Sequence, residues 1–366
     1  MNARALPFVP PPIEHESLGS WLARVSAEYD ISVSDLLRHT GITHRRSQSG
    51  WVNLSALTPA QLELIARRFR IGTQALGRMN APAWMVTQLD AEFGFCPQCI
   101  GEDRHIGRPV HWRREWLDAF CMGCSIHHVP LHPINAAILG KARHGQRAEA
   151  ILWNALAHPD HHERTIIQAR FDSAWVLQRA VFEALCQEEL MQRYQLPTRA
   201  AVRQVAADVL AALLMSDQFL HRGSVAMRVA CLYECDTLVP RLTVMSVQRI
   251  DQPITRLKSF AARCFALSIV DVLLFESTQP LRRREPSLLS ESVLRHEWLW
   301  AFMPWDSRDA LRERSQKWPA NYVQRYWPEL MMPAKPAMMR RSNKRPYLAD
   351  RPLIVPRPAV DRKSVV

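Results

Sequence analysis

Residues 96–127 of this 366-residue chain read CPQCIGEDRHIGRPVHWRREWLDAFCMGCSIH. The stretch begins and ends with a short hook, Cys-Pro-Gln-Cys at 96–99 and Cys-Ser-Ile-His at 124–127. The two ends of a Cys-x-x-Cys or Cys-x-x-His turn can both reach one tetrahedral ion. The spacing therefore predicts a single structural zinc ion held between the two hooks.

The spacing alone leaves the fourth ligand open. Cys121 and Cys124 form a further Cys-x-x-Cys, so a four-cysteine site with Cys121 in place of His127 fits nearly as well. His128 and His132 also lie close by. Both ligand sets therefore stay open at this level.

A catalytic zinc is disfavoured. Such a site needs an open coordination position and a general base, and the chain has no His-Glu-x-x-His run. His161-His162-Glu163 has the His-x-Glu of zinc deaminases, but their cysteine pair follows as Pro-Cys-x-x-Cys, whereas here Cys-Pro-x-Cys precedes it. We expect His158, His161 and His162 to lie in a polar loop between helices.

Other catalytic signatures are missing from the sequence as well. The chain has no glycine-rich phosphate loop with lysine and no Gly-x-Ser-x-Gly elbow. Its 12 glycines disfavour nucleotide-binding folds built on glycine-rich turns. The sequence therefore points to a protein that is not an enzyme.

The sequence predicts a cytoplasmic protein with no membrane partner. No apolar run approaches the roughly 20 residues that cross a bilayer, and the Pro-rich start lacks the apolar core of a signal peptide. Cytoplasmic thiols stay reduced, so clustered cysteines indicate a metal site. The other four cysteines lie on apolar helical stretches and are expected in the core: Cys186, Cys231, Cys235 and Cys264.

The charge favours a nucleic-acid partner. The formal net charge is +12 and the pI is near 9.7. Residues 333–366 hold nine Lys or Arg against two Asp, so this tail carries +7 of that excess. We expect the Pro/Arg-rich tail to be disordered and attracted to phosphate backbones.

Residues 276–330 are rich in Arg and Trp. Basic residues interleaved with aromatic ones can bind single-stranded nucleic acid, but clustered Trp side chains more often form a core or a protein interface. The residues in question are Arg282, Arg283, Arg284, Trp298, Trp300, Trp305, Trp318 and Trp327.

The N-terminal part predicts short helices. Leu18, Trp21, Leu22 and Val25 repeat at the spacing of one apolar helical stripe. A second helix over about 33–39 should stop at Gly41, which suits a left-handed C-terminal position.

Two further helices follow. Thr58 and Gln61 form a capping box around Pro59, the helix should bury Leu62, Ile65, Ala66 and Phe69, and Gly72 should end it. Thr73 should cap a short helix through Met79. Helix, turn and helix over 59–79 are compatible with a DNA-binding helix-turn-helix, and equally with an ordinary helical hairpin.

The second half of the chain predicts longer helices without a clear repeat. Their expected ranges are 151–158, 165–193, 198–215 and about 254–275.

Four segments carry a resemblance to a known family. They are residues 16–24 (ESLGSWLAR), 96–103 (CPQCIGED), 113–116 (RREW) and 124–127 (CSIH), with Leu131 behind the last. In this order they resemble the TniQ family, whose members are related to TnsD, and the resemblance spans about residues 7–135.

The resemblance also selects among the metal ligands. In the family's pattern an Arg and a Trp precede the Cys-x-x-His hook, as Arg113 and Trp116 do here, and Cys121 stands where an apolar residue is usual. The family commonly has Gly where this chain has His128. The ligands that the resemblance implies are Cys96, Cys99, Cys124 and His127.

The resemblance implies a target-selection adaptor in DNA transposition. It would connect its target, either DNA or an RNA-guided Cascade complex, to the transposon AAA+ ATPase and the transposase, and a homodimer is a further option. The alternative is a zinc-containing helix-turn-helix transcriptional regulator. A subunit of an RNA-guided complex that never reads DNA itself is a third reading.

The expected fold is mostly α, with a helix-turn-helix-like unit, a small zinc-finger subdomain, a helical C-terminal domain and a basic tail. The expected domains are 1–145 (helix-turn-helix about 14–80, zinc finger about 91–135), 146–332 and 333–366.

Overall fold

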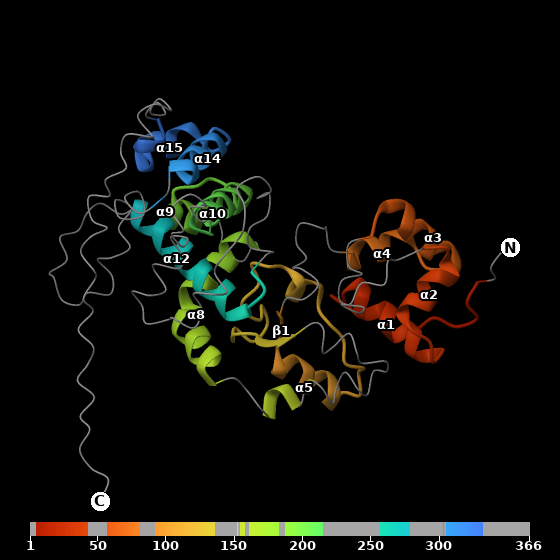
Figure 1. The fold of residues 1–366 in the computed structure, drawn as a ribbon. Helices are drawn as coiled ribbons and strands as arrows, with labels where there is room; N and C mark the ends of the chain where they lie inside the picture. Colours follow the sequence, from red (N-terminus) through yellow and green to blue (C-terminus); the bar gives the residue numbers. More distant parts are fainter. Residues whose placement is uncertain are drawn as a thin grey trace, which may run out of the picture. The chain divides into compact units, whose positions relative to one another are not determined.

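The fold is taken from a computed structural model and is mostly α-helical, as the sequence predicts (Figure 1). Residues Met1–Met331 form one compact unit. The division into domains at about residue 145 stays a prediction. The residues that the structure describes are 5–42, 57–80, 92–135, 152, 154–157, 161–182, 187–214, 257–278, 303 and 305–331.

The first two helices follow the predicted pattern. Ser17 is the N-cap of helix α1 (Leu18–Glu28), and its side chain accepts a hydrogen bond from the Ser20 amide (3.3 Å). Its predicted apolar stripe is fully buried. Helix α2 (Val33–Thr40) ends at Gly41, whose φ of 87° confirms the left-handed C-terminal position.

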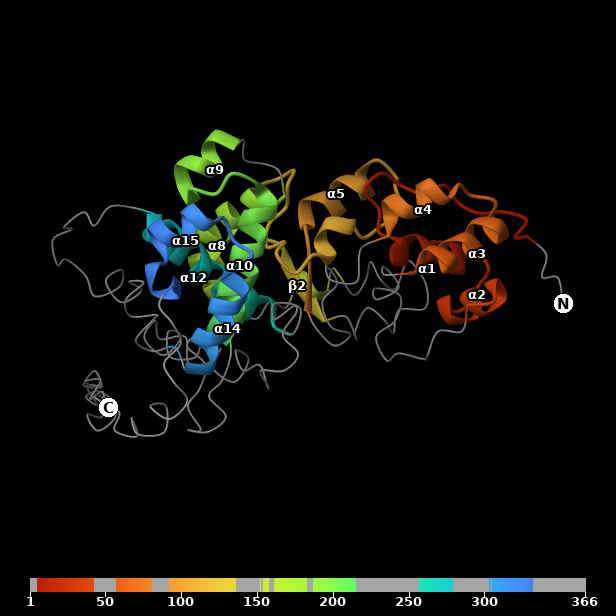
Figure 2. The same cartoon turned by 90° about the horizontal axis from the view of Figure 1, so that it is seen from above.

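The next two helices form the predicted helix, turn and helix (Figures 1 and 2). Helix α3 (Pro59–Phe69) has the expected capping box. The prediction that Gly72 ends α3 and that Thr73 caps the next helix is wrong. Arg70 already turns the chain with a φ of 54°, and Gly72 is the N-cap of α4 (Thr73–Met79).

The stretch around residues 96–127 is framed by a small sheet that the sequence did not reveal. Strand β1 (Glu92–Phe95) pairs antiparallel with β2 (His132–Asn135). Along the chain, the two strands are separated by helix α5 (Pro97–His105) and the 3-10 helix η2 (Arg114–Leu117). Four-residue strands show too little alternation to be predicted from sequence.

The C-terminal elements are again helical (Figure 2). Helix α12 packs along α8 and also contacts α9 and α10. The elements are α8 (His161–Val181), α9 (Gln187–Tyr194), α10 (Arg199–Leu214), α12 (Phe260–Thr278), α14 (Trp305–Ser315), α15 (Ala320–Tyr326) and η7 (Pro328–Met331).

Two of the predicted helices begin or end elsewhere. The range 165–193 is not one helix, because Phe182 lies in a turn and α9 is held separately against α12 through Tyr194 and Asp271. Helix α12 begins at Phe260 rather than 254, since the Phe260 amide donates to the Glu92 carboxylate (2.6 Å). Ser259 is also a local N-cap, because its hydroxyl accepts from the Ala262 amide (3.3 Å).

Other predictions about the second half have mixed outcomes. His161 and His162 begin α8, so the prediction of a polar loop is wrong for them, because the helical pattern of α8 extends back to these residues. The predicted helix at 198–215 is confirmed by α10, and residues 152 and 154–157 are helical.

The core prediction for the tryptophans is confirmed at Trp318 and Trp327, which are buried edge to face, 5.7 Å apart. Cys264 is buried as predicted. Outside the described residues lie Cys186, Cys231, Cys235, His158, Arg282, Arg283, Arg284, Trp298, Trp300 and the tail 333–366.

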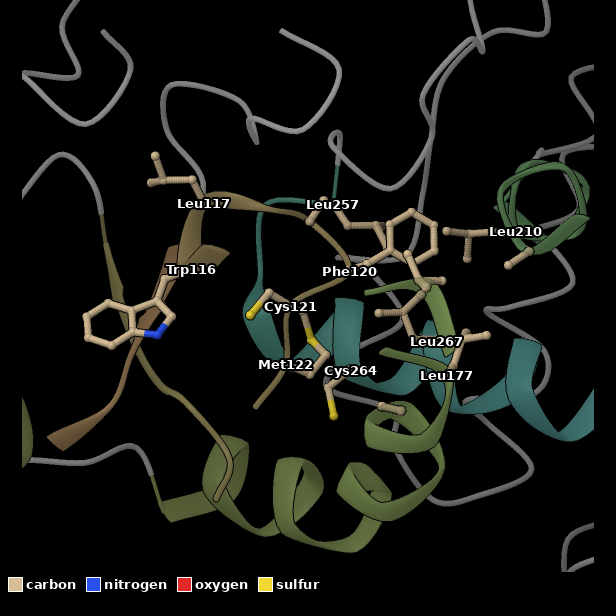
Figure 3. Packing of buried hydrophobic residues seen from close by; sticks show 14 of the residues in the cluster. Trp116, Leu117, Phe120, Cys121, Met122, Leu177, Leu210, Leu257, Cys264 and Leu267 are labelled. Atoms are coloured by element: carbon tan, nitrogen blue, oxygen red, sulfur yellow. The ribbon is translucent and has the colours of Figure 1, made fainter. Parts of the chain in front are cut away.

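The turn at Met122 and Gly123 is packed against helix α8. The Gln178 carboxamide accepts from both backbone amides (2.5 and 2.8 Å) and donates to the Gly123 carbonyl (2.9 Å). Figure 3 shows Met122 beside Cys264 and Leu267 in the shared core. A Cβ added at Gly123 would lie 2.6 Å from the Trp175 ring.

We therefore expect Gly123→Ala to lower the free energy of unfolding by about 1–3 kcal/mol, because the added methyl overpacks a closed contact. Gly77→Ala is the matched control, since nothing lies within 4 Å of the added Cβ in helix α4. That control should be neutral or slightly stabilising. Urea unfolding of both variants measures the difference, and equal stabilities would contradict the contact.

Candidate metal centre

The structure brings Cys96, Cys99, Cys124 and His127 together. Their four ligand atoms all lie within 4.8 Å of one another. The Cys99 and Cys124 sulfurs are 3.5 Å apart, and His127 Nδ1 lies 3.4, 3.3 and 3.6 Å from the Cys96, Cys99 and Cys124 sulfurs. The three cysteines are buried, and His127 is partly exposed.

These separations fit one tetrahedral ion. With a Zn–S bond of about 2.3 Å, two sulfur ligands of a tetrahedral ion lie about 3.8 Å apart, and a sulfur and a nitrogen ligand slightly less. A Cys3His donor set is also one that zinc uses in structural sites. The cluster can therefore hold a metal ion, and its chemistry favours zinc.

The electrostatics of the thiols point the same way. Hydrogen bonds from Cys96 and Cys99 lower the pKa of Cys124, whereas the hydrogen bond to Cys124 raises the pKa of both partners. Ionisation of one thiol therefore disfavours ionisation of the other two. A divalent cation would allow all three to ionise, because each thiolate would face positive charge.

Local backbone geometry places each hook. Cys96 is the N-cap of α5 and Cys99 lies in its first turn, so the strand-to-helix turn presents both sulfurs on one side. In the second hook, the His128 amide donates to the Cys124 carbonyl (2.9 Å), and His128 has a φ of 53°. This left-handed conformation suits glycine better than a residue with a side chain.

His128 nevertheless has a packing role in this chain. Its ring lies 5.6 Å from the Trp175 ring of α8. The aromatic contact stabilises a backbone conformation that a side chain at this position otherwise disfavours.

Cys121 and His132, the other candidates, lie outside the cluster. Cys121 is buried, and its thiol donates to the Gly123 carbonyl (3.5 Å). Burial raises its pKa well above the usual range, so it is an inert core thiol. His132 Nε2 lies 3.1 Å from the Ala155 carbonyl, and burial lowers the pKa of this ring.

The remaining motif residues connect the first helix to the metal segment. The Ser17 amide donates to the Trp112 carbonyl (2.7 Å), and the Trp112 amide donates to the Ser20 hydroxyl (2.9 Å). The buried Glu16 forms an isolated antiparallel bridge with Arg113. The segments 16–24 and 113–116, distant in sequence, therefore form one structural unit.

The acidic and basic residues of these motifs have structural partners. Glu16 accepts two hydrogen bonds from Arg24 (2.9 and 2.6 Å). The Arg113 guanidinium lies 5.8 Å from the centre of the Trp116 ring, a cation–π contact that explains the Arg-x-x-Trp spacing.

A buried pair near the metal centre was missed by the sequence reasoning. His111 Nδ1 lies 3.2 Å from Asp103 Oδ2, and Asp103 Oδ1 accepts from Arg108 (3.1 Å). Burial lowers the pKa of His111, and the charges of Asp103 and Glu16 only partly offset this. The only available signal was Asp103 within the CPQCIGED segment.

Comparison with known proteins agrees with these motifs. Residues 7–131 match the TniQ family model. No curated protein and no solved structure matches the chain. In the described ranges, no helix is long and apolar enough to cross a membrane.

Helices α1 to α4 and the metal segment lie in the part of the chain that is similar to this family. The similarity to the TniQ family covers residues 7–131, about a third of the chain.

We expect Cys99→Ser and Cys124→Ser each to remove one equivalent of zinc and to lower the melting temperature, because each deletes a ligand and the metal stabilises only the folded state. Cys121→Ser is the matched control and should keep its zinc. Elemental analysis and calorimetry measure both effects. If Cys121→Ser lost its zinc and His127→Ala kept it, Cys121 would replace His127 as the fourth ligand.

Proposed function

We propose that this protein is a non-catalytic target-selection adaptor in DNA transposition. It holds one structural zinc ion through Cys96, Cys99, Cys124 and His127, and it connects a target to the transposon AAA+ ATPase and the transposase. The target is DNA or an RNA-guided Cascade complex.

The observation that carries the proposal is the joining of the family's motifs into one unit. Ser17 and Ser20 of α1 bond to the backbone of Trp112, which lies between the two metal hooks. The motif residues are therefore used to hold the helical unit against the metal segment. A helical unit held in this way offers a surface on which partner proteins can bind.

The charged and nucleophilic groups support a role without catalysis. Within the described part of the chain, the buried carboxylates Glu16, Asp118 and Asp271 each accept hydrogen bonds from arginine. The four clustered ligands fill the coordination shell of a structural zinc and leave no position for a substrate.

The exposed face of α4 is the surface through which direct DNA reading would occur. Leu76 and Met79 are buried, whereas Gln74, Gly77 and Arg78 are exposed. A seven-residue helix with this face could enter a major groove, as the alternative of a helix-turn-helix regulator requires.

The adaptor role is tested in a reconstituted reaction with the ATPase, the transposase, donor DNA and target DNA. Leaving this protein out should abolish insertion at the selected site, because nothing then connects target and ATPase. Sequencing of the insertion sites measures the outcome. An unchanged site distribution without the protein would contradict the proposal.

Direct reading of DNA is tested separately with Gln74→Ala and Arg78→Ala. If α4 reads bases, each variant should weaken binding to the selected site by about 1–3 kcal/mol, measured by fluorescence anisotropy against a scrambled duplex. Glu63→Ala on α3 is a control on an exposed side chain paired with Arg67. If the unmodified protein and all three variants bind the selected and the scrambled duplex equally well, the result favours recognition through the RNA-guided complex.

The basic tail generates a further prediction. Removing residues 333–366 deletes nine cationic side chains, so the protein should bind DNA or RNA more weakly at low salt. The slope of log affinity against log salt should flatten by about one for each lost phosphate contact. An unchanged slope would exclude the tail from binding.

A further inference from the structure

Both ring nitrogens of His127 are engaged by residues of one helix. Nδ1 lies 3.3 Å from the Cys99 sulfur, and Nε2 lies 2.9 Å from Glu102 Oε1. The ring is therefore held between a candidate metal ligand on one edge and a carboxylate on the other.

The helical spacing explains how one element reaches both edges. Cys99 and Glu102 are three residues apart in α5, so their side chains lie on the same face of the helix. The Glu102 side chain is 64% exposed and that of His127 is 13% exposed. Glu102 thus meets the solvent-facing edge of the ring, while the other edge faces the sulfurs.

We propose that Glu102 is a positioning residue for the metal centre, which holds His127 with its proton on Nε2 and its Nδ1 lone pair directed at the ion. The inference rests on the proposed zinc site. A carboxylate that accepts from the second ring nitrogen of a metal-bound histidine fixes the tautomer and the ring orientation, and it makes the nitrogen ligand more basic.

Neighbouring carboxylates cannot take this role. Asp103, the next residue, is buried on another side of α5, where it pairs with Arg108 and His111. Glu115 also contacts the second hook, but it accepts from the Ser125 hydroxyl (2.8 Å), which belongs to none of the four candidate ligands. Glu115 therefore provides a matched control.

The test compares zinc affinity in the full-length chain at one fixed neutral pH, by competition with a chromophoric chelator. Glu102→Ala should bind zinc about 10- to 100-fold more weakly than the unmodified chain. Glu102→Gln should recover part of the loss, because its amide oxygen still accepts from Nε2. Glu115→Ala should bind zinc as the unmodified chain does.

A spectroscopic readout separates positioning from a general loss of stability. Long-range nitrogen-proton NMR of the zinc-bound chain should show His127 protonated on Nε2 and metal-bound at Nδ1. In Glu102→Ala the Nε2 proton should exchange faster with water, and Glu115→Ala should leave it unchanged. Because Glu102 is exposed on a helix, alanine is compatible with folding, and circular dichroism checks this.

Two results would overturn the inference and are distinguishable. If the unmodified chain binds no zinc, the zinc proposal fails and this inference fails with it. If the unmodified chain binds one zinc and Glu102→Ala matches Glu115→Ala in affinity and in the His127 spectrum, only the role of Glu102 fails.

Discussion

The meeting of the two hooks, whose outer ligands Cys96 and His127 are 31 residues apart, is the constraint on which the N-terminal part of the described chain depends. Four ligand atoms must lie within 4.8 Å, and the intervening chain must close on itself. The β1–β2 pair brings the two ends together, and His128 accepts a left-handed conformation to complete the second hook. Metal binding would contribute directly to folding, because the unfolded chain has no such cluster.

The constraint extends to the rest of the described chain through polar contacts. Gln178 of α8 satisfies the backbone beside Cys124, and Glu92 of β1 caps α12. The fully buried Arg263 donates to the backbone carbonyl of Glu92 and thereby joins the same strand and helix. Loss of the metal would therefore destabilise the packing of α8 and α12 as well as the hooks.

Local signals in the sequence predicted local structure well. The Ser17 cap, the Thr58 capping box and the Gly41 ending depend on neighbouring residues, so they are legible in sequence. The sheet was not predicted, because its strand pairing depends on contacts between distant segments. The start of α12 was also misplaced, although Ser259 gives it a local N-cap. The four clustered residues were predicted only with the help of the resemblance, since Cys121 fits the spacing nearly as well. The fold separates Cys121 from them, because its thiol lies outside the cluster and contacts the Gly123 carbonyl.

The buried carboxylates of the second half argue for specificity of packing. Burial raises the pKa of Asp118 and Asp271, and the charges of Arg203 and Arg193 only partly offset this. A buried carboxylate that loses its arginine partner destabilises the folded state. Breaking a buried ion pair in this way lowers the free energy of unfolding by about 3–5 kcal/mol. Arg203 of α10 must therefore meet Asp118 of the metal segment, and alternative packings of these elements are disfavoured by charges left unpaired.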